Sequence, residues 1–276
     1  LNINSTIKVY EKMSSLNSDR YEYTLPSYSL SKSIGAELRG NLKFSSQGSH
    51  NIFNTNVSEA NIINDLLYES EDKFLDSGVK NKYNILFKNM NSNGKNSLKY
   101  KEDSEIELLS LFLFESSYPL LREGINFNSY LTPKLSLRYS PNRMKNLSDD
   151  SRRTAVGNIW SLNRIASSET VESGQSLTVG TTYKYAKINE EDLEDIFVFD
   201  IATSFRDKIN DNMPNTSTLG NTSSDIVGSI DISPNKFFKT SYDFSLDNSL
   251  DILKYNYLTT EFNVNNFVTT FKFLEE

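Results

Sequence analysis

Apolar and polar residues alternate with a period of two along several long segments of this sequence. In segment 238–246, mostly aromatic residues occupy the even positions, and lysine, aspartate and serine occupy the odd ones. Segments 131–139, 176–185 and 197–206 alternate in the same way. Successive side chains of a strand point to opposite faces, so each segment predicts a strand with one apolar and one polar face. Helical periodicity is nearly absent, and the sequence therefore predicts an all-β fold.

The predicted strands are long for a soluble protein. We expect about 14 of them, each of about 9–13 residues, against the five or six residues that are usual in globular sheets. A transmembrane β-strand needs about 9–11 residues, with an apolar face toward lipid and a polar face toward an aqueous lumen. A soluble sandwich instead buries the apolar face between two sheets. The sequence favours an antiparallel transmembrane β-barrel of the outer-membrane type.

Turns and loops separate the predicted strands. Short turns are predicted at 91–94, 233–235 and 247–249, and long polar loops at about 140–158 and 207–223. Segment 105–121 has a leucine-rich composition that is also compatible with a short helix, but its neighbours favour a strand. Tyrosines near the predicted strand ends are typical of the aromatic girdle of a barrel. These are Tyr21, Tyr23, Tyr100, Tyr118, Tyr130, Tyr139, Tyr255 and Tyr257.

Composition excludes several classes of function. The chain has no cysteine and a single histidine, His50, which excludes thiolate zinc sites, cysteine nucleophiles and multi-histidine metal sites within it. The net charge of -7 argues against a non-specific nucleic-acid binder. No stretch approaches the roughly 18 apolar residues of a transmembrane helix. We expect no enzyme, no metal and no cofactor.

Three motifs follow one another between residues 131 and 185. The first is P-x-L-x-L-R-Y at 133–139, the second is N-I-W-S-L-N-R at 158–164, and the third is E-x-G-x-x-x-x-x-G-x-x-Y at 172–183. Two weaker matches are Y-E-Y-T-L-P at 21–26 and S-Y-P-L at 117–120. Together they resemble the C-terminal barrel of the LptD family of lipopolysaccharide-assembly proteins, also called organic-solvent-tolerance proteins. Departures from the family pattern are Trp160 for Phe, Asn163 for Asp and Ser117 for Arg.

The resemblance carries definite expectations about function. Such proteins are non-enzymatic translocons of the Gram-negative outer membrane, with a barrel of about 26 strands. They receive lipopolysaccharide from a periplasmic LptA-like bridge and release it into the outer leaflet, with an LptE-like lipoprotein plug in the lumen. We therefore expect residues 1–276 to be part of one LptD-like β-barrel domain, incomplete at both ends, with the lateral gate outside this chain.

The residues alone leave two other functions open. One is a porin-like or fatty-acid channel, because about 14 strands are enough to close a barrel by themselves. The other is a secreted β-rich adhesion or binding domain, whose aromatic faces would pack between two sheets.

Charged residues on the polar faces of the predicted strands are the candidate site residues. Lys134, Arg138, Lys184 and Arg206 would face the lumen, because a charge on the lipid face costs a few kcal/mol. There they could meet the anionic groups of lipopolysaccharide or a plug protein, or simply pair with acids such as Asp200 and Asp243. Arg164, which the resemblance marks, could contact a ligand or tie a loop to the barrel wall through its five donors.

The remaining polar groups carry no specific chemistry. His50 lies in a polar stretch and is predicted to be a surface or turn histidine, without the motif of a serine hydrolase around it. The acidic run 190–195 lacks the order of a calcium loop and predicts a solvated turn. The loop cluster at 207–212 has the same interpretation.

Overall fold

The structure is a computed structural model, and it describes residues 1–13, 20–35, 39–53, 56–165, 167–188, 193–264 and 267–276. The chain divides into two compact units. Unit 1 comprises Leu1–Glu71, Asn84–Phe112 and Ser167–Val171, and unit 2 comprises Asp72–Tyr83, Leu113–Ala166 and Glu172–Glu276. Two strands, β6 and β7, contribute residues to both units.

Unit 1 is built from long strands. They are β1 (Asn2–Glu11), β2 (Tyr21–Ile34), β3 (Gly40–Phe53), β4 (Ser58–Ser70), most of β6 (Lys80–Lys95) and the first part of β7 (Glu105–Ser117). Its buried apolar cluster is small and consists of Ile63, Met90 and Tyr100. Lys88, which is almost fully buried, donates to Asp65 at 2.6 Å.

Unit 2 holds the remaining elements. They are β5 (Lys73–Phe74), β8 (Leu120–Arg122), β9 (Phe127–Ser140), α1 (Val156–Ile159), β10 (Gly174–Ile188), β11 (Leu193–Arg206), the 3-10 helix η1 (Asn215–Ser217), β12 (Ile226–Asn235), β13 (Phe238–Leu246), β14 (Leu253–Val264) and β15 (Phe267–Glu275). No described helix has the length and apolarity to span a membrane.

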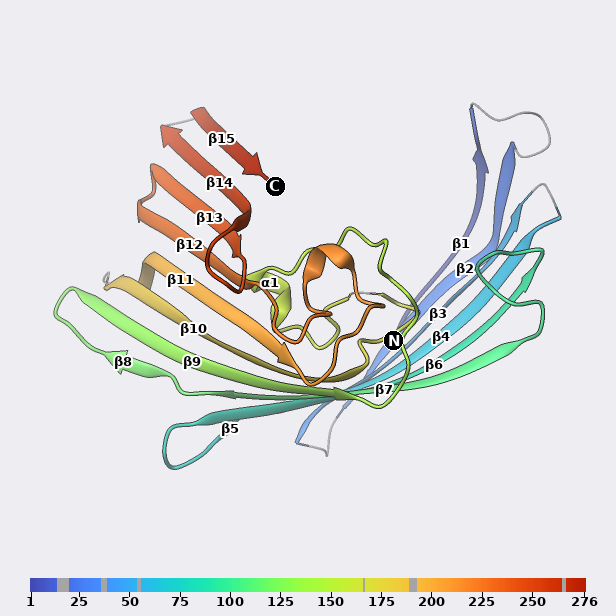
Figure 1. The fold of residues 1–276 in the computed structure, drawn as a ribbon, viewed down its shortest axis with the longest axis horizontal. Helices are drawn as coiled ribbons and strands as arrows, with labels where there is room; N and C mark the ends of the chain where they lie inside the picture. The colour runs from blue at the N-terminus through green and yellow to red at the C-terminus, as the bar shows by residue number, and fades with distance from the viewer. Residues whose placement is uncertain (14–19, 36–38, 54–55, 166, 189–192, 265–266) are drawn as a thin grey trace. The chain divides into compact units, whose positions relative to one another are not determined.

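The strands form an antiparallel sheet that follows the order of the chain (Figure 1). The order is β1-β2-β3-β4-β6-β7-β9-β10-β11-β12-β13-β14-β15, and β5 and β8 pair with β6 and β9. Each strand therefore pairs with its neighbours in sequence, as in an up-and-down barrel. The sheet has 15 strands and is not closed among the described residues, which confirms the predicted all-β antiparallel fold and is consistent with a partial barrel.

Six of the described strands, β2, β3, β6, β9, β10 and β11, exceed the predicted 9–13 residues, and one predicted turn is wrong. Residues 91–94 lie inside β6, which has 16 residues, and Ser92 pairs there with Asn61 of β4. Amide side chains can bond to one another along a sheet: Asn89 Oδ1 accepts from Asn64 at 3.1 Å and from Asn91 at 2.8 Å. These bonds let an asparagine-rich segment continue a strand where its composition predicts a turn.

The other turn, strand and loop predictions are confirmed, except that one turn is displaced. The turn at 247–249 separates β13 from β14, whereas 233–235 ends β12 and the turn follows one residue later. The segment at 105–121 forms β7 and the beginning of β8, not a helix. The two long loops are present, between β9 and β10 and between β11 and β12.

The long loop between β9 and β10, described over 141–165 and 167–173, is called here the internal segment. Its helix α1 packs on one face of β11 and β12, where Ile159 forms a buried cluster with Ala202 and Val227. Figure 1 shows α1 and the loop that follows β11 over the same side of these strands. That face of β9 to β12 is called the inner face, and the opposite one the outer face.

Gly180 of β10 makes room for the internal segment. A Cβ atom placed there would lie 2.9 Å from Cζ2 of Trp160 and 2.8 Å from Cβ of Ala202, and closer still to the carbonyl oxygen of Ile201. Real Cβ atoms do not approach other atoms so closely, so any larger residue would push the tryptophan away from the strand. The glycine of the third motif and the tryptophan of the second are thus packed against each other.

Candidate functional site

Strands β9, β10 and β11 of unit 2 bury their polar face and leave their apolar face more exposed. On β9, Ser136 and Arg138 are 0% and 2% exposed, whereas the neighbouring Leu137 and Tyr139 are 47% and 52% exposed. Water-soluble sheets show the opposite polarity, because apolar burial drives their folding. We therefore expect the apolar outer face to contact a nonpolar solvent or an apolar partner.

Strand register brings the polar residues of the inner face into rows. In one row Arg138 of β9 lies opposite Ser176 of β10, and Ser176 lies opposite Arg206 of β11. The next row consists of Ser136, Thr178 and Ser204. Two arginines are thus aligned on three adjacent strands, with small hydroxyl residues between them that leave space for another side chain.

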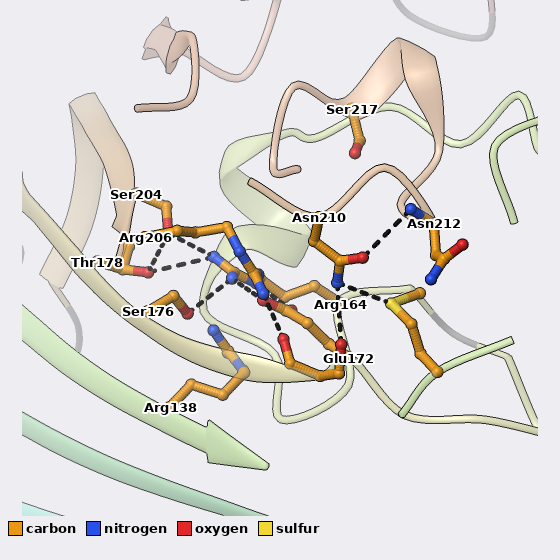
Figure 2. Close-up of polar contacts among 12 residues, drawn as sticks. Arg138, Arg164, Glu172, Ser176, Thr178, Ser204, Arg206, Asn210, Asn212 and Ser217 are labelled. Carbon is orange, nitrogen blue, oxygen red and sulfur yellow. Dashed lines mark hydrogen bonds and ion pairs between the residues drawn. The ribbon is translucent and has the colours of Figure 1, made fainter. Parts of the chain in front are cut away.

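Arg164 of the internal segment fills that space (Figure 2). Its Nε donates to Glu172 Oε2 at 2.8 Å, and its Nη2 donates to Glu172 Oε1. Nη1 donates to Ser204 Oγ at 2.8 Å, and Nη2 also donates to Ser176 Oγ at 2.9 Å. The guanidinium is fully buried, so its planar set of donors ties the internal segment to β10 and β11.

Glu172 is the shared acceptor of two arginines. Besides Arg164, Arg206 donates from Nη1 to Glu172 Oε1 at 2.5 Å, and its Nη2 donates to the carbonyl of Ser173. Burial by itself raises the pKa of the Glu172 carboxyl, but the positive charges of Arg164, Arg138 and Arg206 outweigh it and lower the pKa to about 2. Arg164, Glu172 and Arg206 are called here the buried ion network.

Arg138 lies beside the network and holds a different part of the internal segment. Its Nε donates to the carbonyl of Leu162 at 3.1 Å, and its Nη2 donates to that of Ser161. Three buried guanidinium groups therefore surround one buried carboxylate. Backbone carbonyls and hydroxyls accept from several of the remaining donors, whereas Arg138 Nη1 and Arg206 Nε have no hydrogen-bond partner among the described residues. Because one carboxylate lies among three positive charges, the stability of this arrangement depends strongly on Glu172.

The predicted site residues separate into two groups. Arg138, Arg164 and Arg206 come together around Glu172, whereas Lys134 and Lys184 do not join them. Lys134 lies over the ring of Trp160, with Nζ 5.9 Å from the ring centroid. Lys184 pairs with Asp195 at 2.9 Å, and both side chains are exposed. A function for any of the five in binding a ligand stays a prediction.

Sequence reasoning missed the role of Glu172. It occurs in the third motif, eight residues after Arg164, but only the folded internal segment brings the two side chains together. Serine and threonine partners such as Ser176 and Ser204 are also invisible in the sequence, because nothing distinguishes them from the other hydroxyl residues of the strands.

The other described polar groups considered in the sequence lie in strands or in loops. His50 lies inside β3, half-buried, and not in a turn. In the run 190–195, residues 190–192 lie outside the described residues, and 193–195 begin β11. Asn210, from the loop after β11, donates to Ser173 Oγ at 3.0 Å. Within the described part of the chain, no group of three or more His, Asp or Glu side chains could hold a metal ion.

The first prediction concerns the single acid of the network. Glu172→Gln keeps the size of the side chain but leaves Arg164 and Arg206 without a counter-charge, so we expect the free energy of unfolding to fall by about 3–5 kcal/mol. Asp195→Asn is the matched control, because it removes an exposed ion pair worth at most about 1 kcal/mol. Denaturant titration of both variants measures the difference. Equal losses would contradict a dominant role for Glu172.

The second prediction follows from the pKa of the same carboxyl. Because its pKa in the folded state, about 2, lies below the ordinary value of 4.5, Glu172 stabilises the fold fully above pH 4.5. This contribution is lost as the pH falls from 4.5 toward 2. The difference in unfolding free energy between the wild type and Glu172→Gln should therefore shrink over that range. A difference that stays constant there would show that the carboxyl does not titrate as expected.

The sequence matches the model of a known protein family. A family model described as LptD, LPS transport system D, matches residues 17–274, which include the internal segment and every residue of the buried ion network. No curated protein matches the chain. LptD proteins are outer-membrane proteins of transport and assembly. The match covers far more than half of the chain and confirms the prediction made from the motifs at 131–185: the chain belongs to the LptD family.

Proposed function

We propose that this chain forms part of the wall of an outer-membrane β-barrel that inserts lipopolysaccharide into the outer leaflet. The observation that carries the proposal is the family match over residues 17–274. The polarity of the strands supports it independently, because exposed leucines and aromatic residues alternate with buried arginines and serines. In a barrel, the outer face would contact lipid and the inner face would line a polar lumen.

In such a wall, the buried ion network would hold the internal segment on the polar face of the strands. The internal segment would lie inside the lumen, where its own charges and amides replace water above the polar face of β9 to β11. Arg206 and Arg138 hold it from two sides, through Glu172 and through the carbonyls of residues 161 and 162. In this proposal the arginines fix the shape of the lumen, and the path of the lipopolysaccharide runs past a rigid surface.

The proposal includes partners and a location that follow from the family. Lipopolysaccharide would arrive from a periplasmic LptA-like bridge, an LptE-like lipoprotein would plug the lumen, and the protein would reside in the outer membrane of a Gram-negative cell. No cofactor is required, because the transport of a lipid through a barrel breaks no covalent bond.

The third prediction tests which face of β9 contacts lipid. Leu137 lies on the outer face, in one row with Leu177 and Phe205, so Leu137→Arg should destabilise the protein in a bilayer by about 2–4 kcal/mol. The control is Thr132→Arg on the inner face, where the row includes Asp200 as a partner for the new cation. The folding free energy in lipid vesicles measures both. A larger loss for Thr132→Arg would reverse the assignment of the faces.

The fourth prediction tests the cargo. Depletion of the full-length protein from its source cell should lower the amount of lipopolysaccharide at the cell surface, while the total amount made by the cell changes little at first. Uptake of small solutes and of fatty acids is followed in the same cells. If uptake falls and surface lipopolysaccharide is unchanged, the protein is a channel of the porin or fatty-acid type, and the translocon proposal is wrong.

A further inference from the structure

A pocket of about 230 Å³ lies beside the internal segment in unit 2. Among its lining residues are Lys80 and Lys82 of β6, Glu115 of β7, Lys134 of β9 and Trp160. Lys134 belongs to the polar inner face of β9, two residues before the buried Ser136. The pocket has room for several water molecules, at about 30 Å³ each, or for one ligand of the size of a single sugar.

The charges around the pocket are unevenly paired. Lys80 donates to Asp72 at 2.9 Å, so these two lining residues largely neutralise each other. Among the described residues neither Lys82 nor Lys134 forms an ion pair, and Glu115 is the second acid of the described lining. Three lysines against two acids leave one positive charge in excess, in a chain whose net charge is -7. The pocket therefore attracts anions where most of the chain repels them.

Trp160 adds a flat apolar wall that is held in place. It follows α1 as its C-terminal cap, and its ring packs over Gly180, where no larger residue fits. The Nζ of Lys134 lies 5.9 Å from the centroid of that ring. A cation and an aromatic face thus lie next to each other on one side of the pocket. Apolar walls with a few convergent polar groups are typical of small-ligand sites.

We propose that this pocket binds a phosphorylated sugar. Lys82 and Lys134 would donate to the phosphate oxygens, and the apolar C–H face of the sugar ring would pack on Trp160. Glu115, which also lines the pocket, would accept from a sugar hydroxyl or amine on the side away from the phosphate. The inference rests on the proposed function, because the head group of lipopolysaccharide would supply such a group, and it adds a specific contact point on the inner face.

Trp160 makes the proposal directly measurable. It is the single tryptophan of the 276 residues, and its ring lines the pocket. The full-length protein in detergent is titrated with glucosamine 1-phosphate, with inorganic phosphate and with glucosamine. The fluorescence of the Trp160→Phe variant is subtracted, which removes any contribution from tryptophans elsewhere, and calorimetry gives the affinity without a fluorophore.

The lysines are tested by a double variant, Lys82→Gln with Lys134→Gln, and by a matched control. Lys187→Gln removes one exposed lysine of β10 that does not line the pocket. We expect glucosamine 1-phosphate to change the fluorescence of Trp160 saturably, and to bind at least about tenfold more weakly to the double variant, because each lysine contributes a charge-assisted hydrogen bond. The control should bind like the wild type. Lys82→Arg with Lys134→Arg, which keeps both charges, should restore most of the affinity.

Three results would overturn the proposal. The first is the absence of both a saturable signal and a heat of binding. The second is equal affinity of the wild type and of the correctly folded double variant. The third is binding of glucosamine or inorganic phosphate as tight as that of glucosamine 1-phosphate. Each of these leaves the translocon proposal intact if depletion still lowers surface lipopolysaccharide, so the two proposals fail separately.

Discussion

The carboxylate of Glu172 is the interaction on which the arrangement of unit 2 depends. It accepts from Arg164 and Arg206, and it is a fully buried carboxylate that lies among three buried guanidinium groups. Burying a cation without a partner costs several kcal/mol, so the internal segment can lie on the polar face of β9 to β11 only because this acid lies there too. Gly180 then lets Trp160 approach the strand, and the position of the tryptophan shapes the pocket beside it.

The exposed apolar face and the buried polar face have a common origin in the alternation of the strands. Leu137 and Arg138 are neighbours in sequence, yet one is half exposed and the other is buried. In water such a sheet would expose its leucines at a large cost, whereas in lipid the same leucines are well solvated and the arginines have to be enclosed. The internal segment encloses them, so the folding of this loop and the choice of solvent for the outer face are coupled.

Much of this fold could be predicted, and the exceptions have one cause. Alternation located β9, β10, β11 and β13 and assigned Arg138 and Arg206 to the polar face, because side-chain direction in a strand is a local property. The turn at 91–94 and the girdle role of Tyr100 were wrong: Asn64 of β4 donates to Asn89 of β6 across the strands, and Tyr100 is buried and donates to Glu169 at 2.7 Å. The pairing of Arg164 with Glu172, only eight residues apart, was missed because it depends on how the internal segment folds onto β10 and β11, which no local pattern reveals.

The inner face carries charges of both signs, and this bears on how a charged lipid could pass. Lysines surround the pocket near β9, whereas the register of β11, β12 and β13 places Asp200, Asp231 and Asp243 on the same face. A uniformly basic wall would hold an anionic head group too tightly to release it, and a uniformly acidic one would exclude it. Conduction needs contacts that are strong enough to admit the ligand and weak enough to let it leave. In the proposed barrel, a basic pocket near β9 and carboxylates farther along the same face, on β11 to β13, would meet both conditions, because the acids would limit the residence of a phosphate at the lysines and favour its movement along the wall.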